Sequence, residues 1–346
     1  MIDFFKDFIK FISFKLRKSK NELCFFCENR FILNYLEPFI SKKSKNKPVL
    51  VFCFENIDYK EFKNVDFFFL KTNFFRELFF LTANFKYLYS STPDLENTIF
   101  KRTKFSKCKY IYLSHTPVSL TLIYSESAFD YFDAVQVTSK FQYNELLEII
   151  KNRNLKTKVL KYPYLFVNNQ IKKLNSKRKE KDVLVAPSWN TGFYDLNCHK
   201  ILKQFLDKSS LTYNFRPHPM SIKKKEISFQ ELKSLNYSID DSSFLEFSKY
   251  NFFISDWSGI FIEYALIFKR KAHLINTKTK IVNAKYQNYK NKPLEILLRN
   301  VLAKTFDLNN INDLVDDIKT ENQRKKVNNN FKNDEEVVNI IKKNFY

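Results

Sequence analysis

Short apolar segments alternate with segments of helical period from residue 48 onward, and this alternation constrains the fold more than any other feature. Apolar runs of about four to eight residues are typical of buried strands, whereas apolar residues three or four apart are typical of a helix face. The first half predicts strands at 49–54, 66–70, 87–90, 109–113 and 134–138, with helices beginning at 74 and 140. Strands and helices that alternate in this way predict a parallel sheet covered by helices.

The same alternation returns after a polar, basic stretch at 166–181 that has no apolar periodicity. It predicts strands at 183–186, 212–215, 237–239, 252–254 and 272–275, and helices at 199–207, 229–235, 243–249 and from 258. A chain of 346 residues is long enough for two hydrophobic cores. The sequence therefore predicts an α/β protein with two Rossmann-like domains facing across a cleft. We assign 21–170 to the first domain, 182–300 to the second and 301–346 to a C-terminal helical segment.

The second domain contains a junction at 252–268, FFISDWSGIFIEYALIF, where a strand gives way to a helix. Ser258 and Gly259 stand at the start of that helix, and the chain has only two glycines. A glycine there permits a ligand to approach the backbone, and the unpaired N–H groups of a helix N-terminus favour a phosphate. An ordinary capped turn has the same pattern, so the phosphate interpretation depends on the other candidate residues.

Residues 1–20 predict a basic amphipathic helix. Its apolar face carries Phe4, Phe5, Phe8, Ile9, Ile12 and Leu16. Its lysine and arginine residues lie mostly outside that face. Such a helix can lie in the head-group layer of an anionic membrane, or it can pack on its own domain. The pattern does not separate these two interpretations.

The composition limits the classes of partner. Lys and Arg outnumber Asp and Glu by 59 to 37, and the net charge of +22 permits nucleic acid, an anionic membrane or a phosphorylated substrate. No module interleaves basic and aromatic residues on one face, so we predict no nucleic-acid partner and keep a basic nucleic-acid-binding protein as a second alternative. Five scattered cysteines favour free thiols. No apolar stretch reaches the roughly 20 residues of a membrane span, so we expect a cytoplasmic protein, peripheral at the inner face of the cell membrane.

Polar residues follow several predicted strands, where α/β proteins bind their ligands. His115 follows the strand at 109–113 and stands in the sequence His115-Thr116-Pro117, which predicts a rigid loop. A histidine there can take a proton from an attacking hydroxyl, because its ordinary pKa is near neutrality. A surface histidine without a catalytic role is the alternative.

A second polar loop has the sequence Arg216-Pro217-His218-Pro219. Prolines on both sides restrict the backbone around His218, and an arginine with a histidine can bind phosphate. The alternative is a structural loop in which Arg216 pairs with an acidic residue.

The remaining candidates lie on the donor side of the predicted cleft. Asp256 can orient the junction by bonding backbone N–H groups, and Glu263 can contact a ligand hydroxyl or lie on the surface. Ser188, in the sequence Ala186-Pro187-Ser188-Trp189, follows another strand and is assigned to nucleotide binding, while Trp189 is either core or a nucleobase platform. No Asp-x-Asp motif occurs, so we predict no metal and no cofactor.

These loops together resemble the CDP-glycerol glycerophosphotransferase family, the teichoic acid polymerase-like proteins of GT-B fold. The resemblance covers about residues 85 to 280. Its most specific parts are Arg216-Pro217-His218-Pro219 and Asp256-Trp257-Ser258. It implies that His115 is the base for the acceptor hydroxyl, that Arg216 and His218 bind the donor phosphates, and that the Ser258 turn holds the diphosphate.

The chain departs from the family at two positions. The family usually has His-Gly-Thr-Pro where this chain has His115-Thr116-Pro117, and two serines where it has Ser258 and Gly259. The resemblance implies transfer of glycerol phosphate from a CDP-linked donor to a hydroxyl of a lipid-linked or polymeric surface glycan. The alternative is a GT-B glycosyltransferase that uses a nucleotide sugar in capsule or lipopolysaccharide synthesis. An anionic membrane surface is an expected partner in both cases.

Overall fold

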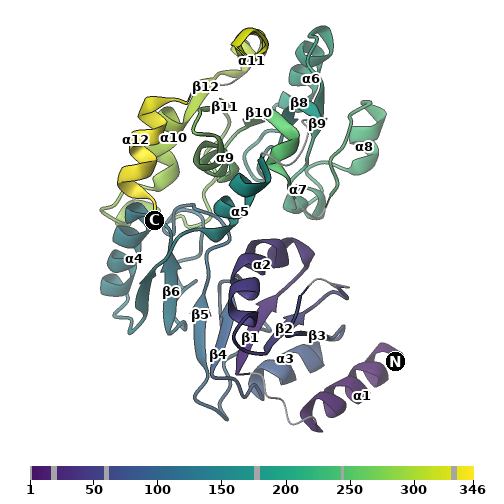
Figure 1. The fold of residues 1–346 in the computed structure, drawn as a ribbon, viewed down its shortest axis with the longest axis vertical. Helices are drawn as coiled ribbons and strands as arrows, with labels where there is room; N and C mark the ends of the chain where they lie inside the picture. The colour runs from purple at the N-terminus through teal and green to yellow at the C-terminus, as the bar shows by residue number, and fades with distance from the viewer. Residues whose placement is uncertain (1, 17–21, 58–61, 175–179, 243–244, 329–332) are drawn as a thin grey trace.

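Two parallel sheets, one from each half of the chain, form the fold (Figure 1). This arrangement is seen in a computed structural model that describes all residues except 1, 17–21, 58–61, 175–179, 243–244 and 329–332. The prediction of an α/β protein with two Rossmann-like halves of GT-B type is confirmed.

The first sheet has seven strands in the order β3-β2-β1-β4-β5-β6-β7, all parallel. The strands are β1 (Leu23–Cys27), β2 (Val49–Cys53), β3 (Val65–Phe69), β4 (Tyr87–Ser90), β5 (Lys109–Tyr112), β6 (Ala134–Val137) and β7 (Lys158–Lys161). The helices of this half are α1 (Ile2–Leu16), α2 (Arg30–Ser44), α3 (Asn73–Leu81) and α4 (Lys140–Asn152). The central strands β1 and β2 are buried along their whole length, which explains their continuous apolar sequences.

The second sheet has five strands in the order β12-β11-β10-β8-β9, also parallel. They are β8 (Lys181–Val185), β9 (Tyr213–Phe215), β10 (Tyr250–Ser255), β11 (Ala272–Ile275) and β12 (Ala303–Phe306). The α-helices that accompany it are α5 (Leu165–Leu174), α6 (Cys198–Lys208), α7 (Pro219–Lys223), α8 (Phe229–Ser234), α9 (Ile260–Phe268), α10 (Leu294–Leu302), α11 (Ile311–Asn328) and α12 (Glu335–Asn344). Short 3-10 turns lie at Phe247–Lys249, Tyr286–Asn288 and Leu308–Asn310.

Several predicted boundaries need correction. The expected linker at 166–181 is mostly the helix α5, and its residues 175–179 lie outside the described part. The segment 301–346 is not only helical, because β12 adds an edge strand to the second sheet. The strand expected at 237–239 is reduced to one bridge between Phe215 and Ile239. The helix expected at 243–249 is a single 3-10 turn in its described residues.

The five cysteines are free and buried. Cys24 and Cys27 lie on β1 in the centre of the first sheet, and burial raises the pKa of both thiols. The prediction of free thiols is therefore confirmed. Buried thiols with a raised pKa are poor nucleophiles, so they serve as small apolar side chains of the core.

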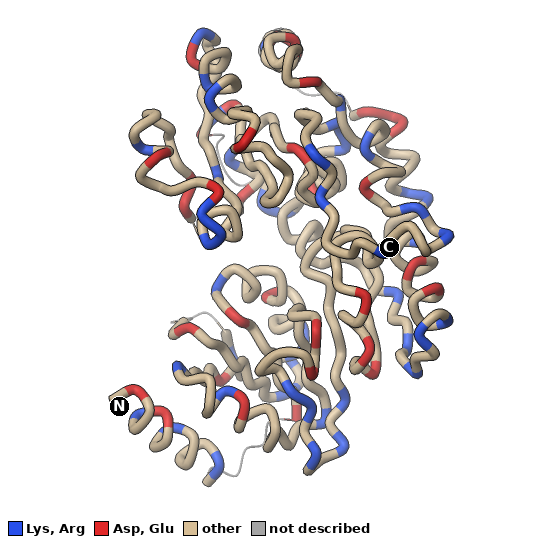
Figure 2. Tube along the Cα trace, turned by 180° about the vertical axis from the view of Figure 1, so that it is seen from behind, with Lys and Arg blue, Asp and Glu red and all other residues tan. Residues whose placement is uncertain are grey.

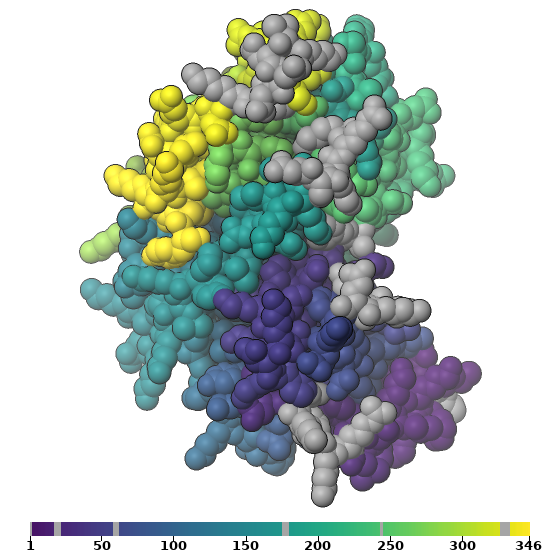
Figure 3. All heavy atoms as spheres, in the orientation of Figure 1, coloured from purple at the N-terminus to yellow at the C-terminus, as the bar shows by residue number. Residues whose placement is uncertain are grey.

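The C-terminal residues return from the second half to the first. The helix α12 packs near α10, and Phe345 then forms an antiparallel bridge with Ser139, the residue that caps α4. The Tyr346 N–H donates to the carbonyl oxygen of Thr138 over 3.0 Å. In Figure 3 this yellow segment lies against the blue-teal residues of the first half. The chain thus connects its two halves at a second place besides the α5 region.

The helix α1 packs on α3 and also presents apolar side chains to solvent. Phe11 is buried against Phe75, with ring centroids 5.8 Å apart. Asp7 is buried too, and its Oδ2 accepts hydrogen bonds from the Thr72 N–H and hydroxyl. Exposed apolar residues on the helix include Ile2, Phe5, Ile9 and Leu16. The helix α1 therefore packs on its own half of the chain, and part of its apolar face remains exposed to solvent. The predicted basic residues at 17, 18 and 20 lie outside the described part.

Lys and Arg are distributed among Asp and Glu over both halves of the described chain, without a single basic stripe (Figure 2). Among the described residues, none of the helices combines the length and the apolar character that crossing a bilayer requires.

Candidate active site

The loop after β5 lies against the N-terminus of α9, so the two halves of the chain touch at the predicted site. The surroundings of Gly259 show how closely the loop approaches the helix. A Cβ atom on Gly259 would lie 2.2 Å from Val118 Cγ1 and 2.9 Å from Thr116 Oγ1. Residues from the first predicted loop and from the strand-to-helix junction are therefore brought together.

Gly259 has a different role from the predicted one. Its φ of −58° is an ordinary helical value, so the backbone conformation does not require glycine. The space that the missing side chain leaves is filled by the loop of the first half and not by open solvent. The expectation that a glycine here serves mainly to admit a ligand is thus corrected: the glycine admits Val118. Ser258 remains at the N-terminus of α9, where N–H groups without intrahelical partners are expected.

His115 lies at this contact between the halves. Its ring is 6.1 Å from the ring of Tyr35 on α2, in an edge-on arrangement. Burial and the charge of Lys280 lower the pKa of His115 to about 4, although the Ser91 backbone partly opposes this. The imidazole is therefore neutral at pH 7. Its Nδ1 is shielded from solvent and has no hydrogen-bond partner in the described residues.

His218 caps the short helix α7. Its Nδ1 accepts a hydrogen bond from the Met220 N–H over 3.0 Å. Burial, followed by the charges of Lys280 and Arg216, lowers the pKa of His218 to about 3. A neutral imidazole that accepts at Nδ1 carries its proton on Nε2. His218 therefore offers a neutral N–H donor and not the positive charge that the sequence led us to expect.

Arg216 is engaged by acidic and polar neighbours. Its Nη1 lies 3.1 Å from Asp240 Oδ1 and donates to Ser242 Oγ over 3.1 Å. Both side chains of the ion pair are largely buried. The alternative interpretation, in which Arg216 pairs with an acid, is therefore correct for this arrangement, and the two-cation phosphate clamp of Arg216 and His218 is not formed.

Lys280 supplies the positive charge that the two histidines do not. It lies in the loop after β11, and its charge lowers the pKa of both His115 and His218. Burial lowers the pKa of Lys280 itself to about 8, against the opposing effects of Asp256 and nearby glutamates. Lys280 was not predicted as a site residue from the sequence. Its position shortly after a predicted strand is the one feature that indicates a site residue. That feature is not distinctive in a chain with 59 basic residues.

Trp189 is covered by two lysines. The ammonium groups of Lys224 and Lys280 lie 4.3 and 4.8 Å from its ring centroid. The ring of His218 is 6.4 Å away. A lysine placed over an indole in this way is held by cation–π attraction. Trp189 is half-buried and is therefore not a core residue, and it holds Lys280 near His218.

Asp256 joins two loops of the second half. It is fully buried, and its carboxylate accepts hydrogen bonds from the Ser188 N–H at 2.7 Å and the Thr191 hydroxyl at 2.5 Å. Burial raises the pKa of Asp256, while these bonds and the charges of Lys280 and Arg299 act in the opposite direction. The Ser188 Oγ is buried and has no partner among the described atoms. Asp256 thus fixes the loop that carries Ser188 and Trp189.

Glu263 is neither a surface acid nor an open ligand contact. It is 2% exposed, and the Tyr164 hydroxyl lies 2.6 Å from its Oε1 and 2.7 Å from the carbonyl oxygen of His115. Burial raises the pKa of Glu263 to about 8. This group of three residues ties α9 to the histidine loop, so Glu263 is a positioning residue between the halves.

A second buried acidic contact joins the halves at Ser119. The Ser119 N–H donates to Glu295 of α10, with both distances 3.1 Å, and its hydroxyl donates to Glu145 of α4 over 2.7 Å. Burial raises the pKa of Glu145 to about 8 and that of Glu295 to about 7. The sequence analysis did not single out either acid, because each lies within an ordinary helical pattern.

One cluster has the residue types of a metal site. Ligand atoms of His273, Asp317 and Glu321 lie within 4.8 Å of one another. However, the Lys304 ammonium lies 2.7 Å from Asp317 and 2.5 Å from Glu321, where a cation would sit. Burial alone would raise the pKa of Asp317, but its bonds to His273 and Lys304 lower it to about 2. The cluster is a charged network that supports β11 and β12.

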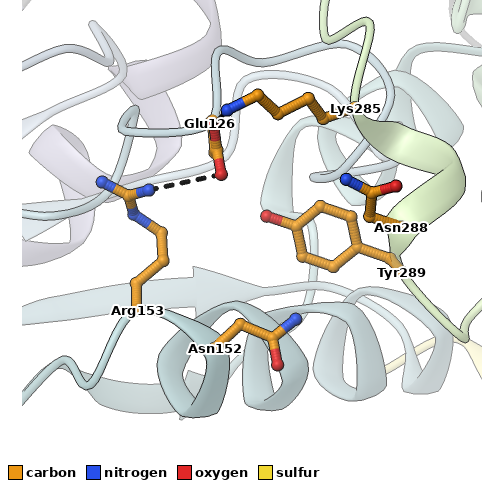
Figure 4. A pocket seen from close by; sticks show the side chains of 6 residues that line it. All are labelled: Glu126, Asn152, Arg153, Lys285, Asn288 and Tyr289. Atoms are coloured by element: carbon orange, nitrogen blue, oxygen red, sulfur yellow. Dashed lines mark hydrogen bonds and ion pairs between the residues drawn. The ribbon is translucent and has the colours of Figure 1, made fainter.

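A small cavity of about 270 Å³ lies where the loop at 285–289 meets the end of α4 (Figure 4). Its lining includes Arg153 and Lys285, and both contact Glu126, at 3.6 and 2.8 Å. The charges of this cavity are thus paired within the protein, and neither site histidine lines it.

The two parallel sheets and their contact define the GT-B class of fold. The structure of UDP-N-acetylglucosamine 2-epimerase from Rickettsia bellii aligns with a TM-score of 0.50 at 12% identity, over 93% of this chain and 98% of that one. The wall teichoic acid polymerase TagF aligns with a TM-score of 0.49 at 12% identity, over 79% and 76%. WaaG, a glycosyltransferase involved in lipopolysaccharide biosynthesis, aligns with a TM-score of 0.42 at 9% identity, over 87% and 91%. At such identities a likeness bears on the fold alone. No protein-family profile and no curated protein sequence matches the chain.

Proposed function

We propose that the chain is a transferase that moves a group from a nucleotide-activated donor to an acceptor hydroxyl. The observation that supports this most is the meeting of His115 from the first half with Lys280 and His218 from the second, at the N-terminus of α9. In this proposal the first half binds the acceptor and the second half binds the donor.

The proposed chemistry divides the work between a base and a phosphate site. His115 is neutral at pH 7, so a ring nitrogen can accept the proton of the attacking hydroxyl. The acceptor oxygen forms a bond to the donor centre as the bond to the nucleotide breaks. The Lys280 ammonium, the Nε2–H of His218 and the N-terminus of α9 stabilise the charge on the departing phosphate. Arg216 contributes less than expected, because Asp240 offsets its charge.

The halves must separate for this chemistry to occur. His115 Nδ1 is shielded from solvent, and Val118 fills the space beside Gly259. An acceptor hydroxyl therefore reaches the imidazole only after the histidine loop and α9 move apart. The proposal includes opening between the halves as a step of each turnover.

Two donors fit the proposed apparatus. With CDP-glycerol, which the motif resemblance favours, the acceptor oxygen attacks the phosphorus that bears glycerol, and CMP leaves. With a nucleotide sugar, it attacks the anomeric carbon, and a nucleoside diphosphate leaves. The acceptor in the first case is a lipid-linked or polymeric surface glycan, and in the second a capsule or lipopolysaccharide precursor. We place the protein at the inner face of the membrane, with the exposed face of α1 as a contact.

A ligand screen followed by two variants tests the proposal. CDP-glycerol, CMP, CDP, and UDP and GDP derivatives are compared for the rise in melting temperature that a native-state ligand produces. His115→Ala is then expected to lower turnover by about 10²-fold or more while donor affinity stays near the wild-type value. His218→Asn retains an N-cap acceptor and removes the Nε2–H, so donor affinity should fall. Full turnover in His115→Ala would remove this histidine from the chemistry, and no response to any nucleotide would refute the proposed function.

A further inference from the structure

The first sheet carries a groove that is separate from the candidate active site. It has a volume of about 670 Å³ and lies beside α2, on the sheet face that includes Tyr87, Tyr89, Ile111 and Leu113. Phe39 of α2 lines one wall. This volume is in the range of sites for a single small ligand. Tyr89, Ile111 and Leu113 are at most 9% exposed, so the floor is an enclosed apolar surface, which suits a ligand that inserts into the groove.

The rim of the groove is basic. Five lysines line it, and Glu22 is the one acidic residue among the lining residues. Glu22 is paired with Lys47 at 2.7 Å, so five positive charges against one negative leave a net charge of +4. Lys43 and Lys86 lie over the rings of Tyr89 and Tyr87, at 5.9 and 5.8 Å from the centroids.

Three of the five lysines lie together at one end of the groove, whereas Lys42 and Lys161 lie beside Tyr162 at the carboxyl end of β7. Lys43 lies in the last turn of α2 and Lys47 follows that helix. Lys86 directly precedes β4, and its N–H is bonded to the Glu22 carbonyl oxygen at 2.9 Å. These three lysines therefore gather at the amino ends of the strands. The apolar floor continues along the strands to Leu113, at their carboxyl ends. The groove thus has three lysines at one end, an apolar floor that leads away from them, and Lys42 and Lys161 beside Tyr162.

We propose that this groove binds one lipid molecule with a phosphate head group, the phosphate at the lysine end and an alkyl chain along the apolar floor. A phosphate matches the net charge of the rim, and an alkyl chain matches the floor. A nucleotide would place its polar base on the apolar floor, so the groove suits it poorly. Because Lys43, Lys47 and Lys86 lie at the opposite strand ends from His115, the phosphate is held away from that histidine, and the bound lipid anchors the first half to a membrane and does not enter the transfer step.

Binding of dodecyl phosphate, measured by calorimetry on the full chain below the concentration at which it forms micelles, tests the proposal. We expect one molecule to bind per chain, and binding to weaken as salt is raised. Dodecyl maltoside has the same chain without the charge, and inorganic phosphate has the charge without the chain. Each is expected to bind at least about tenfold more weakly than dodecyl phosphate.

Two variants locate the site. Lys43→Gln with Lys86→Gln removes two rim charges, and Leu160→Asn changes an exposed apolar wall residue that is 38% exposed. Each is expected to lower dodecyl phosphate affinity about tenfold without a change in melting temperature. The control, Lys200→Gln with Lys233→Gln, removes two exposed lysines of the second half and should bind as the wild type does.

Three results would overturn the proposal. The first is equal binding of dodecyl phosphate to the wild type and to both groove variants, and the second is equal binding of dodecyl maltoside. The third is a dimer in sedimentation that must dissociate before dodecyl phosphate binds, which would make the groove a subunit interface. The nucleotide-induced rise in melting temperature is measured on the same variants. Lys43 and Lys86 lie at the amino ends of the strands, opposite His115, so that rise should be unchanged in the charge variant, and a failure of this proposal is distinguished from a failure of the proposed function.

Discussion

The close approach at Gly259 gives the sharpest test of the arrangement. Gly259→Ala places a Cβ atom 2.2 Å from Val118 Cγ1, a distance at which one of the two groups must move. The backbone there is helical, so alanine itself adds no conformational strain. Overpacking of this kind costs about 1–3 kcal/mol, or about 2 °C in melting temperature for each kcal/mol in a chain of this size.

A double-mutant cycle isolates the contact. Val118→Ala alone removes two buried methyl groups and should cost about 1–2 kcal/mol. In the double variant the new Cβ meets the Cβ at position 118 at 3.7 Å, an ordinary contact, while Thr116 Oγ1 at 2.9 Å still has to move, so we expect a favourable coupling of about 1 kcal/mol. Thermal and denaturant unfolding measure the four stabilities.

The other glycine provides the control. Gly192 has a φ of +73° and no atom within 4 Å of an added Cβ, so Gly192→Ala should be destabilised by backbone strain alone, by about 1–2 kcal/mol. Val118→Ala should not relieve that loss. If Gly259→Ala melts with the wild type, or if Val118→Ala rescues both glycine variants equally, the contact between the histidine loop and α9 does not exist as described.

Three further predictions follow from the site and from α1. Lys280→Met should raise the pKa of both site histidines toward the ordinary value in an NMR titration and lower donor affinity about tenfold or more; unchanged histidine titrations would contradict the central place given to this lysine. Glu263 has a folded pKa of about 8 against an ordinary 4.5, so the folded state binds its proton more tightly and the wild type should lose stability as pH rises from about 4.5 to about 8. Glu263→Gln should reduce that fall in melting temperature, and an identical pH profile would show that the carboxyl is not buried. Phe5→Gln with Ile9→Gln changes side chains that are 64% and 52% exposed, so it should weaken binding to anionic vesicles while leaving the melting temperature unchanged; full vesicle binding would rule out this face.

The sequence predicted most of the central strands and two of the four edge strands, β3 and β9. Strands such as β2 and β10 are buried on both faces and therefore appear as continuous apolar runs. The edge strands β7, with the sequence KVLK, and β12, with AKTF, are short and carry lysines, so they had no recognisable pattern and form by pairing with a neighbour. The central strand β1, with the sequence LCFFC, was not predicted, because it precedes residue 48, where the recognisable alternation of strands and helices begins.

The candidate active site could likewise be predicted from the sequence only in part. The loops of His115 and His218 were predictable, because polar residues after buried strands meet at one edge of a parallel sheet. Their charge states were not, because these depend on burial and on Lys280, which is distant in sequence. The pairing of Arg216 with Asp240 is likewise a tertiary contact, and local sequence does not distinguish it from a free phosphate ligand.

The return of the C-terminus to Ser139 has a mechanical consequence. A single linker would leave the second half free to bend and to twist relative to the first half. Here the chain passes from the first half to the second near α5, and the bridge between Phe345 and Ser139 joins the two halves again. The halves are also joined by the contacts of Ser119 with Glu295 and of Glu126 with Lys285, which the proposed opening must break. If the connections at α5 and at Phe345 remain during that opening, they limit the sideways displacement of His115 relative to Lys280.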